Sequence, residues 1–148
     1  MQGMVLHHEQ ALEMTALVPD RTSRDDIPLL AKRLEISQQD EIAQMQRWLE
    51  SRGEDATHHG DHDHSMHMPG MLTAAELAEL RASSGADFDR LFLRSMIRHH
   101  EGALAMVEQL QAEGGGEESE ISQFTGHVVA DQGVEIARMT ELLSQLGA

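Results

Sequence analysis

Cysteine is absent from the 148-residue chain, and this absence removes several kinds of chemistry at once. Without a thiol the chain forms no disulfide, thiolate nucleophile, iron–sulfur cluster or thiolate zinc site. Basic residues are also few, because 11 Lys and Arg stand against 26 Asp and Glu, a formal net charge of −15. Such a surface repels nucleic acid and anionic membranes, and no apolar run approaches the roughly 18 residues that span a bilayer. The composition therefore predicts one soluble domain, residues 1–148, that binds no nucleic acid and spans no membrane.

Aromatic residues are scarce as well, with one Trp, three Phe and no Tyr. Histidine and methionine are abundant instead, with 10 residues of each. Imidazole and thioether groups are ligands for copper. This balance is unusual for an ordinary hydrophobic core and directs attention to metal binding.

Two sequence segments occur twice. Residues 4–14, MVLHHEQALEM, match residues 96–106, MIRHHEGALAM, at seven of eleven positions, and residues 38–49 match residues 132–143 at Gln, Glu, Ile, Ala, Met and Leu. Both segments are rich in helix-forming residues, have apolar residues at three and four spacing and contain no proline. The pattern predicts a duplicated helical hairpin, with repeat halves at about 1–53 and 86–148. Two such hairpins form a four-helix bundle when they bury their apolar stripes together.

Proline, glycine and capping residues set the expected helix boundaries. The first helix is expected to stop at Val18 before Pro19, and Thr73 with Glu76 has the spacing of a capping box. The first copy of the repeat lacks a counterpart of residues 87–92, so we expect the chain to begin after a removed export signal or a cut. The predicted helices cover about 1–18, 27–53, 73–83, 86–113 and 118–146, with a His/Met-rich loop over 54–72.

The repeated segments supply the first group of candidate metal ligands. On a helix their His and Met residues fall within an arc of about 120°, so they face one way. The second helix of each hairpin adds a Gln, a Glu and a Met at three and four spacing. The Met stripes also fit plain core packing, and the His pairs also fit hydrogen bonding to the facing Glu and Gln. The candidate ligands on the helices are Met4, His7, His8, Met14, Glu41, Met45, Met96, His99, His100, Met106, Glu135 and Met139.

The loop supplies the second group. It mixes imidazoles and thioethers without a thiolate, which favours Cu(I) or Ag(I) through sulfur and Cu(II), zinc or nickel through nitrogen. The alternative interpretation is a solvated polar linker. His127 stands alone on the last helix and is expected to be an ordinary, partly buried histidine. The candidate ligands in the loop are His58, His59, His62, His64, Met66, His67, Met68 and Met71.

The chain resembles the bacterial ferritin-like family known as domain of unknown function 305. That family combines a Met-x-x-His-His-x-x-Ala-x-x-Met helix with a Gln-x-x-Glu-Ile-x-x-Met helix, and both patterns occur here twice, over residues 4–14 with 38–45 and residues 96–106 with 132–139. A Met-Pro-Gly-Met segment before the second half also matches, at residues 68–71. The resemblance implies an all-helical bundle in the periplasm or outside the cell, and some members bind copper or silver and contribute to copper resistance.

Three classes of function remain open from the sequence. The first is a non-enzymatic protein that sequesters or carries copper, chiefly Cu(I), with silver or zinc as further ions and another copper-handling protein as a partner. The second is a metal-dependent redox enzyme, although the Glu-x-x-His of di-iron proteins and the His-Glu-x-x-His of zinc hydrolases are both absent. The third is a metal-independent module in which His protonation changes packing or assembly.

Overall fold

The computed structural model describes residues 1–54 and 68–147 of the chain. Every regular element in these residues is helical, which confirms the predicted all-helical fold. The elements are α1 (Gln2–Thr15), the 3₁₀-helix η1 (Val18–Asp20), α2 (Asp26–Glu50), α4 (Ala74–Ala82), α5 (Gly85–Ala112) and α6 (Ser119–Gln145).

The α1 helix ends three residues earlier than the sequence predicts. Pro19 has no N–H to donate, and its ring would meet the carbonyl of Thr15 if the helix continued. The chain therefore leaves the α-helix after Thr15 and makes the short η1 turn, with Pro19 in its first turn. The capping box of α4 is confirmed, because Thr73 Oγ1 accepts a 3.2 Å bond from the Glu76 N–H while Glu76 Oε2 accepts a 2.7 Å bond from the Thr73 N–H.

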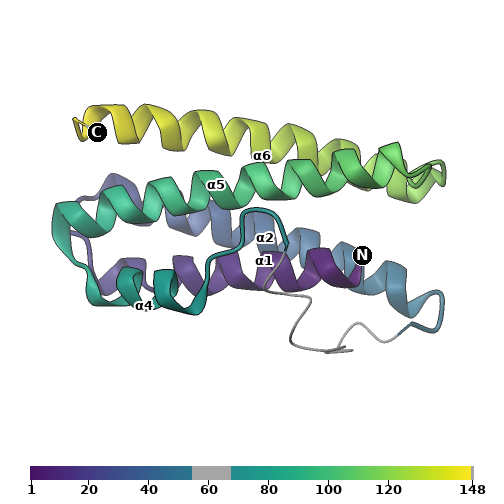
Figure 1. Cartoon of the computed structure of the whole chain (residues 1–148), viewed down its shortest axis with the longest axis horizontal. Coiled ribbons are helices and arrows are strands. Elements are labelled where there is room, and N and C mark those ends of the chain that lie inside the picture. The colour runs from purple at the N-terminus through teal and green to yellow at the C-terminus, as the bar shows by residue number, and fades with distance from the viewer. Residues whose placement is uncertain (55–67, 148) are drawn as a thin grey trace.

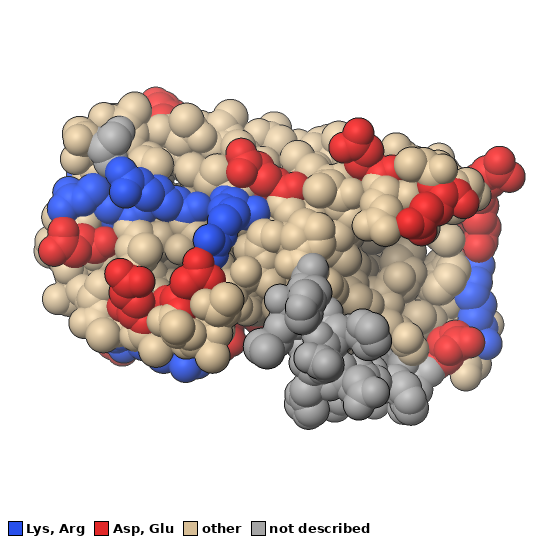
Figure 2. Space-filling view, in the orientation of Figure 1, with Lys and Arg blue, Asp and Glu red and all other residues tan. Residues whose placement is uncertain are grey.

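The four longer helices lie side by side in two antiparallel pairs (Figure 1). The α1 helix packs along α2 and the α5 helix along α6, while α1 also contacts α5 and α2 contacts α6. The short α4 helix lies against α5 at the end of the molecule that also holds the C-terminus. On the face seen in Figure 2, basic side chains gather near that end beside acidic ones. Ion pairs from Arg81 to Glu13 and from Arg98 to Glu76 join α4 to α1 and to α5.

The apolar interior is divided into two clusters. One contains Phe88 and Phe92 with residues from both pairs of helices, and the other contains Phe124 and Val128. On α1, Met4 belongs to the second cluster and Met14 to the first, and ten residues of helix separate them by about 15 Å. The residues between them on α1 therefore lie at the boundary of the two clusters.

Candidate metal centre

Between the two apolar clusters lies a layer of buried polar side chains, here called the polar layer. Helices α1 and α5 each contribute an adjacent pair of histidines, whose rings are fully buried, and helices α2 and α6 contribute carboxylate and amide groups. The helical periodicity of the repeated segments produces this arrangement, because each His pair follows a buried Met by one turn. The polar layer consists of the buried His7, His8, Gln38, Glu41, His99, His100 and Gln132 and the half-buried Glu135.

One histidine of each pair is hydrogen-bonded to a glutamate on the neighbouring helix. His8 Nε2 lies 2.5 Å from Glu41 Oε2, and His100 Nε2 lies 2.8 Å from Glu135 Oε2. Gln132 Nε2 also donates to Glu41 Oε2 over 3.4 Å, which links α6 to α2. These bonds tie the helices of each pair together at corresponding positions.

The other histidine of each pair lies at the contact between α1 and α5. The rings of His7 and His99 have centroids 3.9 Å apart at an interplanar angle of 39°. Burial lowers the pKa of His7 to about 4, despite the hydrogen bond to the Pro69 carbonyl. Burial also lowers the pKa of His99, and the neighbouring His7 adds to that effect. Both imidazoles are therefore neutral at pH 7, and one nitrogen of each ring carries a lone pair instead of a proton.

Residues 68–72, here called the strap, cover this His7–His99 contact. His7 Nε2 donates to the Pro69 carbonyl over 2.9 Å. Gln10 anchors the end of the strap with two bonds to Leu72, donating to its carbonyl over 2.9 Å and accepting from its N–H over 2.7 Å. The strap lies so close to α5 that a Cβ built on Gly102 would be 2.0 Å from the Pro69 carbonyl oxygen. The strap is therefore packed tightly against both helices that carry the histidine pairs.

Many polar atoms of the polar layer have no protein partner. Buried polar atoms normally have one, because an unpaired donor or acceptor costs about 1–3 kcal/mol. Four ring nitrogens are among them, one on each histidine, and a nitrogen without a proton can instead donate its lone pair to a metal. The atoms without a partner in the polar layer are His7 Nδ1, His8 Nδ1, His99 Nε2, His100 Nδ1, Gln38 Nε2 and Oε1, Glu41 Oε1 and Gln132 Oε1.

Thioethers lie on both sides of the polar layer. The first apolar cluster contains three buried methionines, and the second contains two, with two more packed against it. In residues 1–54 and 68–147, no group of three or more His, Asp or Glu side chains is already arranged to hold a metal ion. The combination of neutral imidazoles and thioethers nevertheless fits a soft monovalent ion better than an oxygen-seeking one. The first cluster holds Met14, Met96 and Met139, and the second holds Met4 and Met45, with Met1 and Met106 packed against it.

Of the candidate ligands in the loop, the structure describes only Met68 and Met71. Met68 is half-buried, with its sulfur 3.4 Å from the position of a Cβ on Gly3, and Met106 also reaches that position. Met71 is half-buried as well. The other loop candidates, His58, His59, His62, His64, Met66 and His67, lie outside the described residues.

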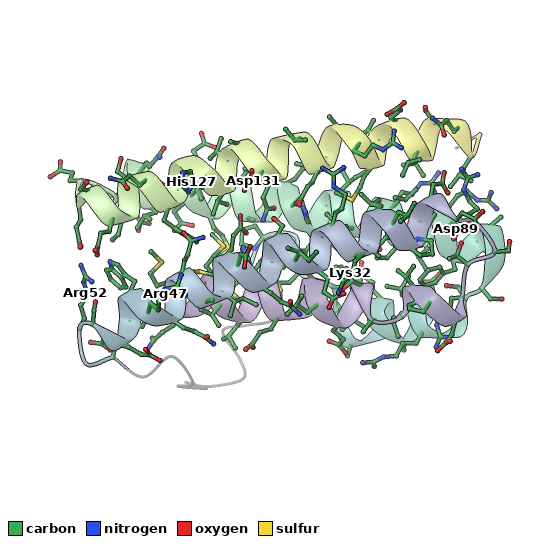
Figure 3. All side chains as sticks on the ribbon, turned by 180° about the vertical axis from the view of Figure 1, so that it is seen from behind. Lys32, Arg47, Arg52, Asp89, His127 and Asp131 are labelled. Atoms are coloured by element: carbon green, nitrogen blue, oxygen red, sulfur yellow. The ribbon has the colours of Figure 1, made fainter. Side chains whose placement is uncertain are left out.

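The structure corrects the prediction for His127. Its side chain is exposed on α6, two positions after the buried Thr125 (Figure 3). It lines a surface pocket of about 300 Å³ together with Trp48 and Phe124, away from the polar layer. His127 is thus neither partly buried nor part of the candidate metal centre.

The sequence analysis missed two residues that hold the centre in place. Gln10 differs from Gly102 at the equivalent position of the repeat, and these two residues respectively anchor the strap and admit it. The signal available in the sequence was this difference between two otherwise similar repeat segments. Each half of the repeat contacts the strap through a different chemical group.

The fold and centre define a class of all-helical protein with buried His, Glu, Gln and Met side chains at the junction of two helix pairs. The chain belongs to the family described as domain of unknown function, DUF305, whose family model matches residues 1–143. No curated protein matches the chain.

Solved structures of this family are similar to the chain over nearly its whole length. A DUF305 fragment from Deinococcus radiodurans is 32% identical, with a TM-score of 0.86 and coverage of 97% of this chain and 92% of that one. A DUF305 protein from Streptomyces coelicolor, named as a candidate secreted protein, is 29% identical, with a TM-score of 0.82 and coverage of 99% and 91%. CopM in its Cu(I)-bound form has the same fold, with 23% identity, a TM-score of 0.76 and coverage of 97% and 92%.

Proposed function

We propose that this protein is an extracytoplasmic copper-binding protein that sequesters or carries Cu(I), with Ag(I) as an equivalent ion and Cu(II) as a second state. The observation that carries the proposal is the polar layer, where four buried histidines each leave one ring nitrogen without a protein partner. Imidazoles flanked by thioethers prefer soft metals. CopM, which shares the fold, has been crystallised in Cu(I)-bound, Cu(II)-bound and Ag-bound forms.

The proposed role is binding and transfer rather than catalysis. The histidines and methionines would hold the ion, and the strap would restrict its access to water and to competing ligands. Another copper-handling protein would be the donor or acceptor of the ion. The family relative named as a candidate secreted protein supports a place outside the cytoplasm. Among the described helices, none has the length and apolar composition of a membrane span.

We propose that the two helix pairs form a ferritin-like bundle that arose by duplication of one hairpin. What supports this is the equivalence of two contacts, since His8 meets Glu41 and His100 meets Glu135 through the same pair of atoms. A duplicated hairpin supplies each ligand type twice, which allows the two halves to contribute to one centre or to two.

An anaerobic titration tests the copper proposal. Chelator-stripped protein is titrated with Cu(I) against a competing chelator, in parallel with Zn(II). One variant replaces the loop candidates His58, His59, His62, His64, Met66 and His67 by Ser, a second carries His8→Ala with His100→Ala, and the matched control carries His127→Ala at the exposed histidine.

Tight Cu(I) binding that survives the loop variant and the control but is lost in the double His variant is the expected result. Binding that is lost only in the loop variant would contradict a centre in the polar layer. Absence of Cu(I) binding by the intact chain would remove the copper function and leave the redox enzyme and the pH-responsive module as the remaining classes.

A pH-responsive module is a second candidate, favoured by the lowered pKa values of His7 and His99. Protonation of either ring would place a charge in the buried contact between α1 and α5. This candidate requires that acid change assembly or packing without metal, and size measurement in chelator between pH 7 and pH 5 distinguishes it from copper binding.

A further inference from the structure

The orientation of the histidines assigns the two nitrogens of each ring different roles. Three of the four rings direct Nε2 to an oxygen of the protein: His7 to the Pro69 carbonyl, His8 to Glu41 and His100 to Glu135. We infer that these three oxygens are positioning groups rather than metal ligands, and that His7, His8 and His100 bind the metal through Nδ1. This inference rests on the proposed copper function and names the atoms through which it operates.

The bond from His7 fixes its tautomer directly. A carbonyl oxygen can only accept a hydrogen bond, so Nε2 of His7 carries the proton and Nδ1 carries the lone pair. Nδ1 of His7 is buried and has no protein partner. Because the two nitrogens lie on opposite sides of the ring, the lone pair points away from the strap.

His8 and His100 repeat this arrangement with carboxylates as the acceptors. The carboxylate oxygens of Glu41 and Glu135 accept the hydrogen bond from Nε2 of these rings, and Nδ1 of each ring has no protein partner. Metal-bound histidines commonly donate the other ring N–H to a carboxylate or a backbone carbonyl, which fixes the ring and raises its basicity. In this protein, the acceptors of that N–H are the Pro69 carbonyl, Glu41 and Glu135.

Substitution of Glu41 provides the strictest test of this inference. Its Oε2 already accepts from His8 and from Gln132, but its Oε1 is buried without a partner. A carboxylate that bound the metal directly through Oε1 would be a ligand as well as an acceptor. A substitution that keeps an accepting oxygen but removes the charge separates these two roles.

The first experiment compares Gln and Ala at the two glutamates. In Glu41→Gln and Glu135→Gln, the amide oxygen still accepts from the histidine, so Ag(I) affinity stays within a few-fold of the intact chain. In Glu41→Ala and Glu135→Ala the acceptor is lost, and we expect affinity to fall by 10–100-fold, the usual effect of removing such a partner. Equal losses in the Gln and Ala variants would identify the carboxylates as ligands and overturn the inference.

The second experiment needs no variant, so it holds even if the Ala variants fail to fold. Long-range proton–nitrogen NMR spectra of the ¹⁵N-His-labelled full chain are recorded before and after addition of Ag(I), whose nuclear spin couples to a directly bonded nitrogen. We expect His7, His8 and His100 to be protonated at Nε2 in both states and to show the silver coupling at Nδ1. The exposed His127 is the internal control for an imidazole outside the centre.

The outcomes separate this inference from the copper proposal. Silver coupling at Nε2 of His8 or His100, or a proton on Nδ1 in the metal-free protein, would overturn the inference and leave copper binding intact. Absence of silver coupling at all four histidines of the polar layer would overturn both.

Discussion

At the scale of single residues, two glycines allow the strap to approach α5. Gly70 has a φ of +78°, a conformation that residues with a Cβ rarely adopt, and a Cβ there would be 2.4 Å from the Arg98 carbonyl oxygen. Gly102 faces it from the interior of α5, where glycine is otherwise unfavourable by about 1 kcal/mol relative to alanine. The close approach places the Pro69 carbonyl where His7 can donate to it.

Gly102→Ala should therefore destabilise the protein, although alanine is the better helix former. The added methyl group would lie 2.0 Å from the Pro69 oxygen and would displace the strap, at a cost of about 1–3 kcal/mol in the free energy of unfolding. Urea unfolding followed by circular dichroism measures this change.

Gly126→Ala on α6 is the matched control, because nothing lies within 4 Å of a Cβ at that position. It should stabilise the protein by up to about 1 kcal/mol. A stabilising Gly102→Ala would show that the strap does not need the glycine.

At the scale of elements, the strap is a short irregular segment held by side chains instead of by a helix of its own. Both backbone groups of Leu72 are bonded to Gln10, and Thr73 immediately begins the capped α4 helix. The ion pair from Arg98 to Glu76 then joins α4 to α5. The strap is thus fixed between α1 on one side and α4 on the other.

Gln10→Ala should release the end of the strap. Two hydrogen bonds are lost and the buried groups of Leu72 are left without partners, so we expect a loss of about 1–3 kcal/mol in unfolding free energy. The Leu72 amide should also exchange with solvent faster in hydrogen-exchange measurements.

The exposed Gln39, whose one side-chain bond is to Glu35, provides the control. Gln39→Ala should leave both the stability and the Leu72 exchange rate nearly unchanged. Equal exchange rates in Gln10→Ala and in the unmodified chain would contradict the anchoring role.

At the scale of the whole molecule, the polar layer interrupts what would otherwise be one continuous apolar core. Each apolar cluster on its own resembles the interior of an ordinary helical protein. The interruption lowers stability through unpaired buried groups, and it provides donors for a ligand. Such a layer is stable only because the two clusters on either side hold the helices together.

The metal-free protein should lose stability in acid through this layer. The pKa of His7 is lowered from 6.5 to about 4 in the folded state, so its contribution is fully present above pH 6.5 and is lost as the pH falls toward 4. At pH 5 this histidine alone should reduce the free energy of unfolding by about 2 kcal/mol relative to pH 7.5. Thermal unfolding in chelator across this range measures the loss.

His7→Gln should make that profile less steep between pH 6.5 and pH 5 without flattening it, because the buried His99 with its lowered pKa remains. His127→Gln at the exposed site should leave the profile unchanged. A profile that is equally steep in His7→Gln and in the unmodified chain would mean that His7 is not neutral and buried in solution.

The helical class can be read from the sequence alone, as can the positions of the helices to within a few residues and the set of donors in the interior. This is possible because a 3.6-residue period, helix breakers and the two copies of the His-His segment are local features of the chain. The α1 helix ends three residues before the predicted boundary, because Pro19 also removes the preceding turn from the α-helix.

The use of these donors depends on how the helices pack in three dimensions. Which histidine of each pair meets a glutamate depends on how α1 rotates against α2 and α5 against α6. The strap contacts of Gln10, Gly102 and Pro69 join residues that are far apart in the sequence, and no local pattern specifies such contacts. Burial of His7 and His99 against each other, and the neutral state that burial imposes, likewise follow from packing of the two helix pairs.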